Sequence, residues 1–120
     1  MSARQYGFPE TLRLKTAGEF DYVFAEPCRA ANACFTALAR ANRQDQPRLG
    51  LVISKRCAKS AVQRNRLKRL IRESFRHSQA HLAGLDIVVI GKHSAVTKTN
   101  QELFSLLHRQ WLELERCKHS

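Results

Sequence analysis

The segment 55–76 constrains this chain most, because as a helix it would carry an apolar stripe and a basic stripe on opposite sides. At roughly 100° per residue, with Val62 set at zero, the core-facing positions span a sector from roughly 80° to 220°. These positions are Leu67, Leu70, Ile71, Ser74 and Phe75. Arginines and Asn65 fill the opposite sector. We therefore predict a helix over about 58–77 that packs one face on a core and turns the other face to a partner.

The basic stripe holds most of the positive charge of the chain. The 120 residues carry a formal net charge of +11 at pH 7, and the segment 55–76 contributes nine basic residues against Glu73 alone. Like charges three and four positions apart on a helix repel, so a helix built only for stability would carry more acids. An acidic membrane surface would also attract this charge, but arginine, which predominates here, suits bidentate contacts with phosphate groups.

We therefore predict that this face binds a phosphate polymer. The candidate residues for this contact are Lys55, Arg56, Lys59, Arg64, Asn65, Arg66, Lys68, Arg69, Arg72 and Arg76.

Three segments have the pattern of β-strands. Apolar and polar side chains alternate over 32–41 and again over 48–55, and two such strands joined by a polar turn predict an antiparallel hairpin. In the first of these strands we expect Phe35 to face the core. The apolar run 85–92 is rich in β-branched residues and is typical of a strand covered on both faces.

Two capping boxes predict two further helices. The first, at Thr16, begins a short helix over about 17–25, and the second, at Thr99, begins the last helix of the chain. The predicted order is α-β-β-α-β-α with an extra short strand near residue 30, a single α+β domain over 1–120 with helices packed on a small sheet. The basic helix would join two strands as a β-α-β crossover, for which the right hand is the default.

The titratable residues form no recognisable catalytic or metal-binding motif. The four cysteines lack a zinc spacing, and we expect them to be reduced thiols in a cytoplasmic protein, since the chain has neither a secretory signal nor an apolar run of membrane-spanning length. Of the ten acidic residues, only Asp86, which opens a strand, is well placed for a site. We expect no catalytic residues and no metal ligands, which disfavours a protein-based nuclease.

The run KRCAKSAVQRNRLKRLIRESFR, residues 55–76, resembles the signature of the bacterial ribonuclease P protein family. Three blocks outside it also resemble the family: RLKTAGEFDYVF from 13, RLGLVISKR from 48 and DIVVIGK from 86. The resemblance covers nearly the whole chain and is weakest over 39–47 and after 105. It implies a two-layer α-β sandwich, the ribosomal protein S5 domain 2-like fold, with a left-handed β-α-β crossover in place of the right-handed default.

The resemblance also implies a function. The protein would bind a large catalytic RNA, one copy to each RNA, and the complex would remove the 5′ leader of precursor tRNA. The RNA would carry the chemistry with Mg²⁺, and the protein would add affinity for the leader.

A cleft for this leader needs a positive groove with flat surfaces for bases, which fits the less apolar face of the strand 32–41 beside the first helix. The candidate leader-binding residues are Phe20, Phe24, Thr36, Leu38 and Arg40. The spacing of Phe20 and Phe24 fits ordinary core packing as well. Leu38 stands where some members of the family carry an aromatic residue.

Two other interpretations stay open. A ribosomal or other RNA-scaffold protein would share the charge and the fold class but would need no leader groove. A helix-turn-helix DNA-binding protein would need a short helix and a tight turn just before the basic helix, whereas strands are predicted there.

Overall fold

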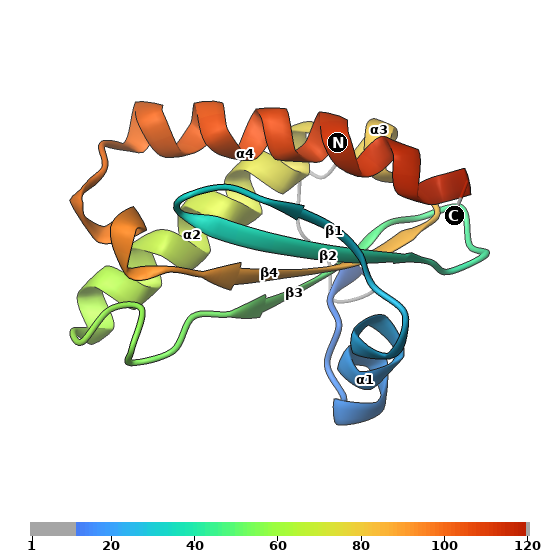
Figure 1. Cartoon of the computed structure of the whole chain (residues 1–120), viewed down its shortest axis with the longest axis horizontal. Helices are drawn as coiled ribbons and strands as arrows, with labels where there is room; N and C mark the ends of the chain where they lie inside the picture. Colours follow the sequence, from blue (N-terminus) through green and yellow to red (C-terminus); the bar gives the residue numbers. More distant parts are fainter. Residues whose placement is uncertain (1–11, 120) are drawn as a thin grey trace, which may run out of the picture.

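The computed structural model describes residues 12–119 and shows a four-stranded sheet with helices on both faces. The strands are β1 (Cys28–Ala31), β2 (Phe35–Ala41), β3 (Arg48–Val52) and β4 (Leu85–Gly91). They lie in the order β1-β2-β4-β3, in which β2 pairs antiparallel with β1 and β4, and β3 pairs parallel with β4. Figure 1 shows α2 and α4 on one side of the sheet and α1 on the other. This α+β sandwich confirms the predicted fold class.

The helices begin where their capping residues predict. They are α1 (Ala17–Ala25), α2 (Ala61–His77), the short α3 (Gln79–Leu82) and α4 (Asn100–Leu114), with 3-10 turns η3 (His93–Thr97) and η4 (Glu115–His119). Both predicted capping boxes are present, since the Thr16 and Thr99 side chains each accept the backbone N–H three residues on and the glutamate there reaches back. Ser60 caps α2, which therefore begins three residues later than predicted.

The predicted hairpin is wrong. β2 and β3 are not neighbours, because β4 lies between them and pairs with both: Val88 is opposite Leu38 on one side and Gly50 on the other. A strand that is apolar on both faces buries most surface at the centre of a sheet, and β4 is buried from Leu85 to Val89. The extra strand expected near residue 30 is β1. The β-α-β unit is confirmed, since α2 joins β3 to the parallel β4, and the hand of this crossover stays a prediction.

Two apolar clusters hold the layers together. The larger lies between the sheet and the helices α2 and α4, where Phe35 is fully buried, as predicted. Here the Phe75 and Trp111 rings meet edge to face at 6.0 Å, and Trp111 Nε1 donates to Ser74 Oγ at 2.8 Å. The smaller cluster fixes α1 to the opposite face through Val23 and the sheet residue Leu38.

The cysteines depart from the prediction of four reduced thiols. Cys28 in β1 and Cys117 in η4 form a disulfide, with Cα atoms 5.7 Å apart, while Cys34 and Cys57 are free and buried. Spacing could not show this pair, because β1 and η4 are 89 residues apart in the chain. In the part of the chain described, no helix is both long enough and apolar enough to cross a membrane.

Candidate nucleic-acid interface

The outward face of α2 forms a basic hollow. Five polar and charged side chains line it together with Glu73: Asn65, Lys68, Arg69, Arg72 and Arg76. The opposite face carries the predicted apolar stripe, whose members are all buried. Val62, at the reference angle on the basic side, is 78% exposed. The helix therefore presents its charge and buries its stripe as the sequence predicts.

Three cations of this hollow have no anion or acceptor to bind. Lys68, Arg69 and Arg72 make no hydrogen bond or ion pair with any described residue, and the buried Nε of Arg72 lacks an acceptor. Burial, followed by the positive charge of Arg13, lowers the pKa of Arg72. A partly desolvated guanidinium without a counter-ion is unfavourable by itself. An anion placed here would remove that penalty.

The other arginines of α2 have partners inside the protein. Arg64 Nη1 donates to the carbonyls of Ala58 and Lys59 at 3.0 and 2.8 Å. Arg66 donates to Asn100 Oδ1 from Nε and Nη2, at 3.1 and 2.9 Å, and to the Lys98 carbonyl at 2.7 Å. Arg76 pairs with Glu73. The periodicity of the sequence could not separate these arginines from the unpaired ones, because the partners of Arg66 lie in another segment and those of Arg64 are backbone carbonyls of the preceding loop.

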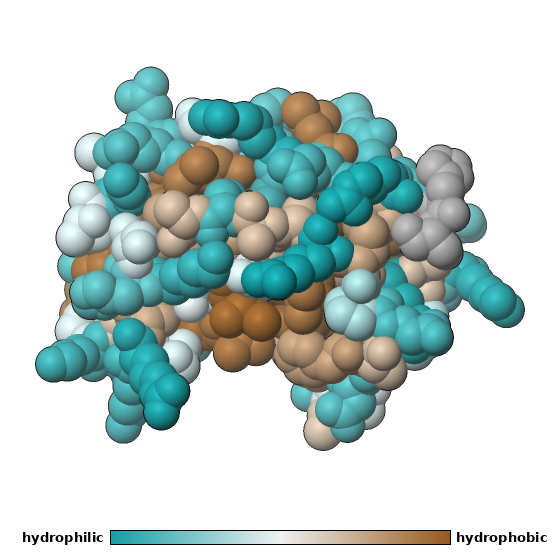
Figure 2. All heavy atoms as spheres, viewed as in Figure 1, coloured by the Kyte–Doolittle hydropathy of each residue, from teal (hydrophilic) through white to brown (hydrophobic). Residues whose placement is uncertain are grey.

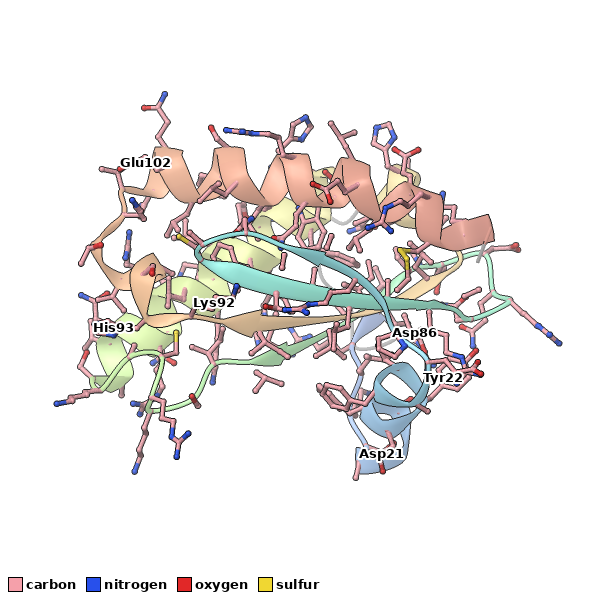
Figure 3. The ribbon with its side chains drawn as sticks, in the orientation of Figure 1. Asp21, Tyr22, Asp86, Lys92, His93 and Glu102 are labelled. Atoms are coloured by element: carbon pink, nitrogen blue, oxygen red, sulfur yellow. A yellow bond between two sulfur atoms is a disulfide. The ribbon has the colours of Figure 1, made fainter. Side chains whose placement is uncertain are left out.

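The loop between β3 and α2 adds a second basic surface. Lys55, Arg56 and Lys59 are all exposed on it. Contacts with the residues that follow β4 hold the loop backbone in place. His93 Nδ1 lies 3.1 Å from the Cys57 carbonyl, and the Cys57 thiol donates to the Lys92 carbonyl. Figure 3 shows Lys92 and His93 at this end of the sheet, where β4 ends. The three predicted cations of the loop are therefore presented to solvent by a fixed backbone.

The sheet face that carries α1 forms an apolar hollow beside this loop. In Figure 1 both α1 and the loop project from the same side of the sheet, and Figure 2 shows a hydrophobic surface recessed between them. Its floor is a row of half-buried residues across three strands: Thr36 of β2, Ile90 of β4 and Val52 of β3. Val52 and Ile90 are absent from the sequence-based site, because the neighbour of β3 was predicted wrongly.

The two candidate phenylalanines border the hollow from α1. Their ring centroids are 6.5 Å apart, and Phe24 is 43% exposed. Phe20 packs against the smaller cluster and lies over Gly50, where an added Cβ would come within 2.5 Å of the ring atom Cζ. Phe20 is therefore partly packed in the core while Phe24 is exposed, and leader binding by either ring stays a prediction.

The other two candidate leader residues, Leu38 and Arg40, contact α1 or the residue that caps it. Leu38 is only 9% exposed and belongs to the cluster beneath the helix. The Arg40 guanidinium lies 3.9 Å from the centroid of the Tyr22 ring, donates to the Tyr22 carbonyl at 2.9 Å and pairs with Glu26 at 2.9 Å. In this arrangement Leu38 and Arg40 hold α1 on the sheet, and they stay predictions as RNA contacts.

A small pocket at the outer edge of β3 links the two surfaces. Phe20 and Gly50 line it from the sheet side, and Lys68 and Arg72 line it from α2, together with Arg13. Arg13 lies there because the chain before α1 runs along β3, with the Leu14 N–H donating to the Leu49 carbonyl at 3.0 Å. Sequence reasoning missed Arg13, since nothing in its local spacing shows that it lies near α2.

Asp86, the acid that the sequence places best for a site, is part of a buried ion pair. It is fully buried and accepts from Arg48 Nε at 2.9 Å and Nη2 at 2.7 Å, and from Asn42 Nδ2 at 2.9 Å. Asp86 raises the pKa of Arg48, which also bonds Glu19 at 2.8 Å. Figure 3 places Asp86 close to Tyr22 of α1, away from the loop. Among residues 12–119, no three His, Cys, Asp or Glu side chains are grouped to hold a metal ion.

Comparison with known proteins identifies the family of this chain. The family model described as Ribonuclease P matches residues 8–115. The chain belongs to the ribonuclease P protein family. Its curated relatives include the "Ribonuclease P protein component" of Pseudoalteromonas translucida, 45% identical over 94% of this chain and 81% of the relative. That of Methylococcus capsulatus is 44% identical over 96% and 91%.

Solved ribonuclease P proteins share the fold. A mutant of the Staphylococcus aureus protein has a TM-score of 0.82 at 30% identity, covering 89% of this chain and 90% of that one. The Thermotoga maritima protein has a TM-score of 0.68 at 32% identity, covering 90% and 96%. The resemblance seen in the sequence is therefore confirmed, and the ribonuclease P family membership makes RNA the first candidate for the anion that the α2 face lacks.

Proposed function

We propose that this protein is the protein subunit of ribonuclease P, binding the catalytic RNA through the outward face of α2 and the 5′ leader of precursor tRNA in the apolar hollow. Family membership supports the assembly. The single observation that carries the RNA-binding role is the set of unpaired cations, Lys68, Arg69 and Arg72, in one hollow of α2.

Phosphate groups meet the needs of this face. A phosphate beside Arg72 supplies the acceptor that the buried Nε lacks, and its charge offsets both the burial and the repulsion from Arg13. Two further cations within the same hollow allow successive phosphates of one strand, or of two strands across a groove, to be bound together. Counterion release makes such binding strong at low salt and weak at high salt.

The apolar hollow suits a single strand. Bases of single-stranded RNA stack on aromatic and apolar surfaces, and each stacked base contributes about 1–3 kcal/mol. Phe24 and the floor formed by Val52 and Ile90 offer such a surface. The loop that carries the exposed Lys55 and Arg56 projects from the same side of the sheet as α1 (Figure 1), where these cations would meet the phosphates. The pocket at the edge of β3 continues from Phe20 to the cations of α2.

In this proposal the protein binds and orients, while the RNA performs the cleavage. The catalytic RNA with Mg²⁺ supplies the hydrolytic chemistry, and one protein copy on each RNA raises the affinity for the leader. The nearest candidate for an acid–base residue, Asp86, is held by Arg48 and Asn42, so it has no oxygen in reach of a substrate. We assign this work to the cytoplasm, where tRNA precursors are made in bacteria.

Salt dependence tests the binding surface. Replacing Lys68 and Arg69 together by alanine should weaken binding to the catalytic RNA and reduce the slope of log K against log salt by about 1 for each phosphate that the variant no longer binds. Fluorescence anisotropy at several salt concentrations measures both quantities. The matched control, Arg109→Ala with Lys118→Ala, removes two cations from outside the α2 hollow and should leave the slope unchanged. Equal slopes for the two double variants would contradict the proposal.

A further inference from the structure

Arg66 differs from its neighbours on the basic face of α2, because its guanidinium is already occupied. Two of its nitrogens bond Asn100 Oδ1, and one of these also bonds the Lys98 carbonyl. These acceptors belong to the junction between η3 and α4, 34 and 32 residues further along the chain. Arg69, one turn away, has no such partner among residues 12–119.

These bonds join α2 to the start of α4. Near the C-terminal end of α2, Ser74 and Phe75 contact Trp111 of α4. Near the N-terminal end, Arg66 links α2 to Asn100, the first residue of α4. The two helices are therefore linked near both ends of α2, and the Arg66 link is a polar constraint added to the apolar core that the helices share.

We propose that Arg66 is a positioning residue: it fixes α2 against the start of α4 and so holds the hollow of Lys68, Arg69 and Arg72 in the shape that matches RNA. This inference rests on the proposed RNA-binding function of α2. The planar guanidinium of Arg66 is held by two acceptors within the protein, Asn100 Oδ1 and the Lys98 carbonyl. It therefore has little freedom to reorient toward a phosphate. The phosphate contacts then belong to the unpaired cations.

Asn100→Ala separates this role from direct contact. The substitution removes the shared acceptor of Arg66, keeps every charge of the protein, and leaves the Thr99 cap of α4 intact. Alanine also suits the first position of a helix. We expect the folded variant to bind the catalytic RNA roughly three- to tenfold more weakly with an unchanged salt slope. Arg66→Lys, which keeps the charge but loses the fork, should behave in the same way.

A double-mutant cycle completes the test. Arg66→Ala combined with Asn100→Ala should be no weaker than Arg66→Ala alone, because both changes break one link. Gln101→Ala, at the next and exposed position of α4, is the control and should bind as the unmodified protein does. Affinity is measured well below the melting temperature, and circular dichroism confirms that each variant is folded. A purely structural role of Arg66 would lower the melting temperature without changing the affinity of the folded protein for RNA.

Two results would overturn the inference in different ways. Unchanged affinity of Asn100→Ala, together with a slope reduced by about 1 in Arg66→Ala, would show that Arg66 binds a phosphate itself. Unchanged affinity of the Lys68→Ala, Arg69→Ala variant would instead remove the RNA-binding function of α2, and the inference with it.

Discussion

Gly50 shapes the hollow through the side chain that it lacks. A Cβ at this position would lie 2.5 Å from Phe20 Cζ and 3.2 Å from Leu14 Cβ, so the ring of Phe20 lies where any other residue would place an atom. The space matters for function as well as packing, because Phe20 borders both the apolar hollow and the pocket that leads to α2.

Gly50→Ala should therefore displace Phe20. We expect a loss of about 1–3 kcal/mol in the free energy of unfolding, as for other overpacked sites, and weaker binding of a leader oligonucleotide. Urea unfolding and fluorescence anisotropy measure the two effects. Gly18→Ala is the matched control, since its Cβ would meet only Thr16 Oγ1 at 3.9 Å and alanine favours the helix. If both variants kept full stability and leader binding, the role of Phe20 in the hollow would be wrong.

Glu19 should make the stability of the protein depend on pH in acid. Its carboxylate accepts from the backbone N–H groups of Lys15 and Thr16, at 2.7 and 2.9 Å, and faces Arg48, so its pKa lies below the ordinary value of 4.5. The stability that it contributes is complete above the unfolded-state pKa and disappears as the pH falls through the lowered folded-state pKa.

The measurement is urea unfolding between pH 7 and pH 3. Glu19→Gln keeps an acceptor in the capping box but cannot titrate, so its stability should fall less steeply over the acidic part of this range. Identical pH profiles for the two proteins would show that Glu19 does not contribute.

At the scale of elements, local patterns predicted the three longer helices, α1, α2 and α4, but neither the short α3 nor the order of the strands. The 3.6-residue period predicted the buried stripe of α2, and the capping boxes at Thr16 and Thr99 located the starts of α1 and α4. The order of the strands depends on which segments meet across long separations, and no local period contains that information. The same limit explains why the partners of Arg66 and the position of Arg13 were not predicted.

The disulfide ties the last element to the edge of the sheet. Closing a loop of this length removes conformational entropy from the unfolded chain, worth about 4.6 kcal/mol in the chain-entropy model. Reduction of Cys28–Cys117 should therefore lower the melting temperature by roughly 10 °C or more. Thermal unfolding with and without dithiothreitol measures the shift.

A variant without the bond supplies the control for that prediction. Cys28→Ser with Cys117→Ser should melt near the reduced protein and should not respond to dithiothreitol, because Cys34 and Cys57 are free thiols. Equal melting temperatures for the oxidised and reduced protein would contradict a stabilising bond.

At the scale of the whole molecule, the surface has a basic part, formed by α2 and the loop before it, and an apolar hollow beside that loop (Figure 2). The segment 55–76 carries nine basic residues against one acid, in a chain whose net charge is +11. The fold places this charge on the outward face of α2 and on the loop beside the apolar hollow, while the acids Glu19 and Asp86 are used within the protein. The arrangement suits a large folded RNA on one side and a flexible single strand beside it.

A β-strand and an exposed loop precede α2, which argues against the helix-turn-helix alternative. Leader binding in the hollow beside α1 would distinguish the proposed subunit from an RNA-scaffold protein, because a scaffold has no need of a surface for single-stranded bases.

Reconstituted cleavage measures whether this protein works as a ribonuclease P subunit. The protein is added to a bacterial ribonuclease P RNA with precursor tRNA at a Mg²⁺ concentration too low for the RNA to work well alone, and release of the 5′ leader is followed on a gel. The account predicts faster cleavage at the mature 5′ end, saturating near one protein per RNA, with more of the Lys68→Ala, Arg69→Ala variant needed for the same rate. If the protein left the cleavage rate unchanged at every concentration, the account would be wrong.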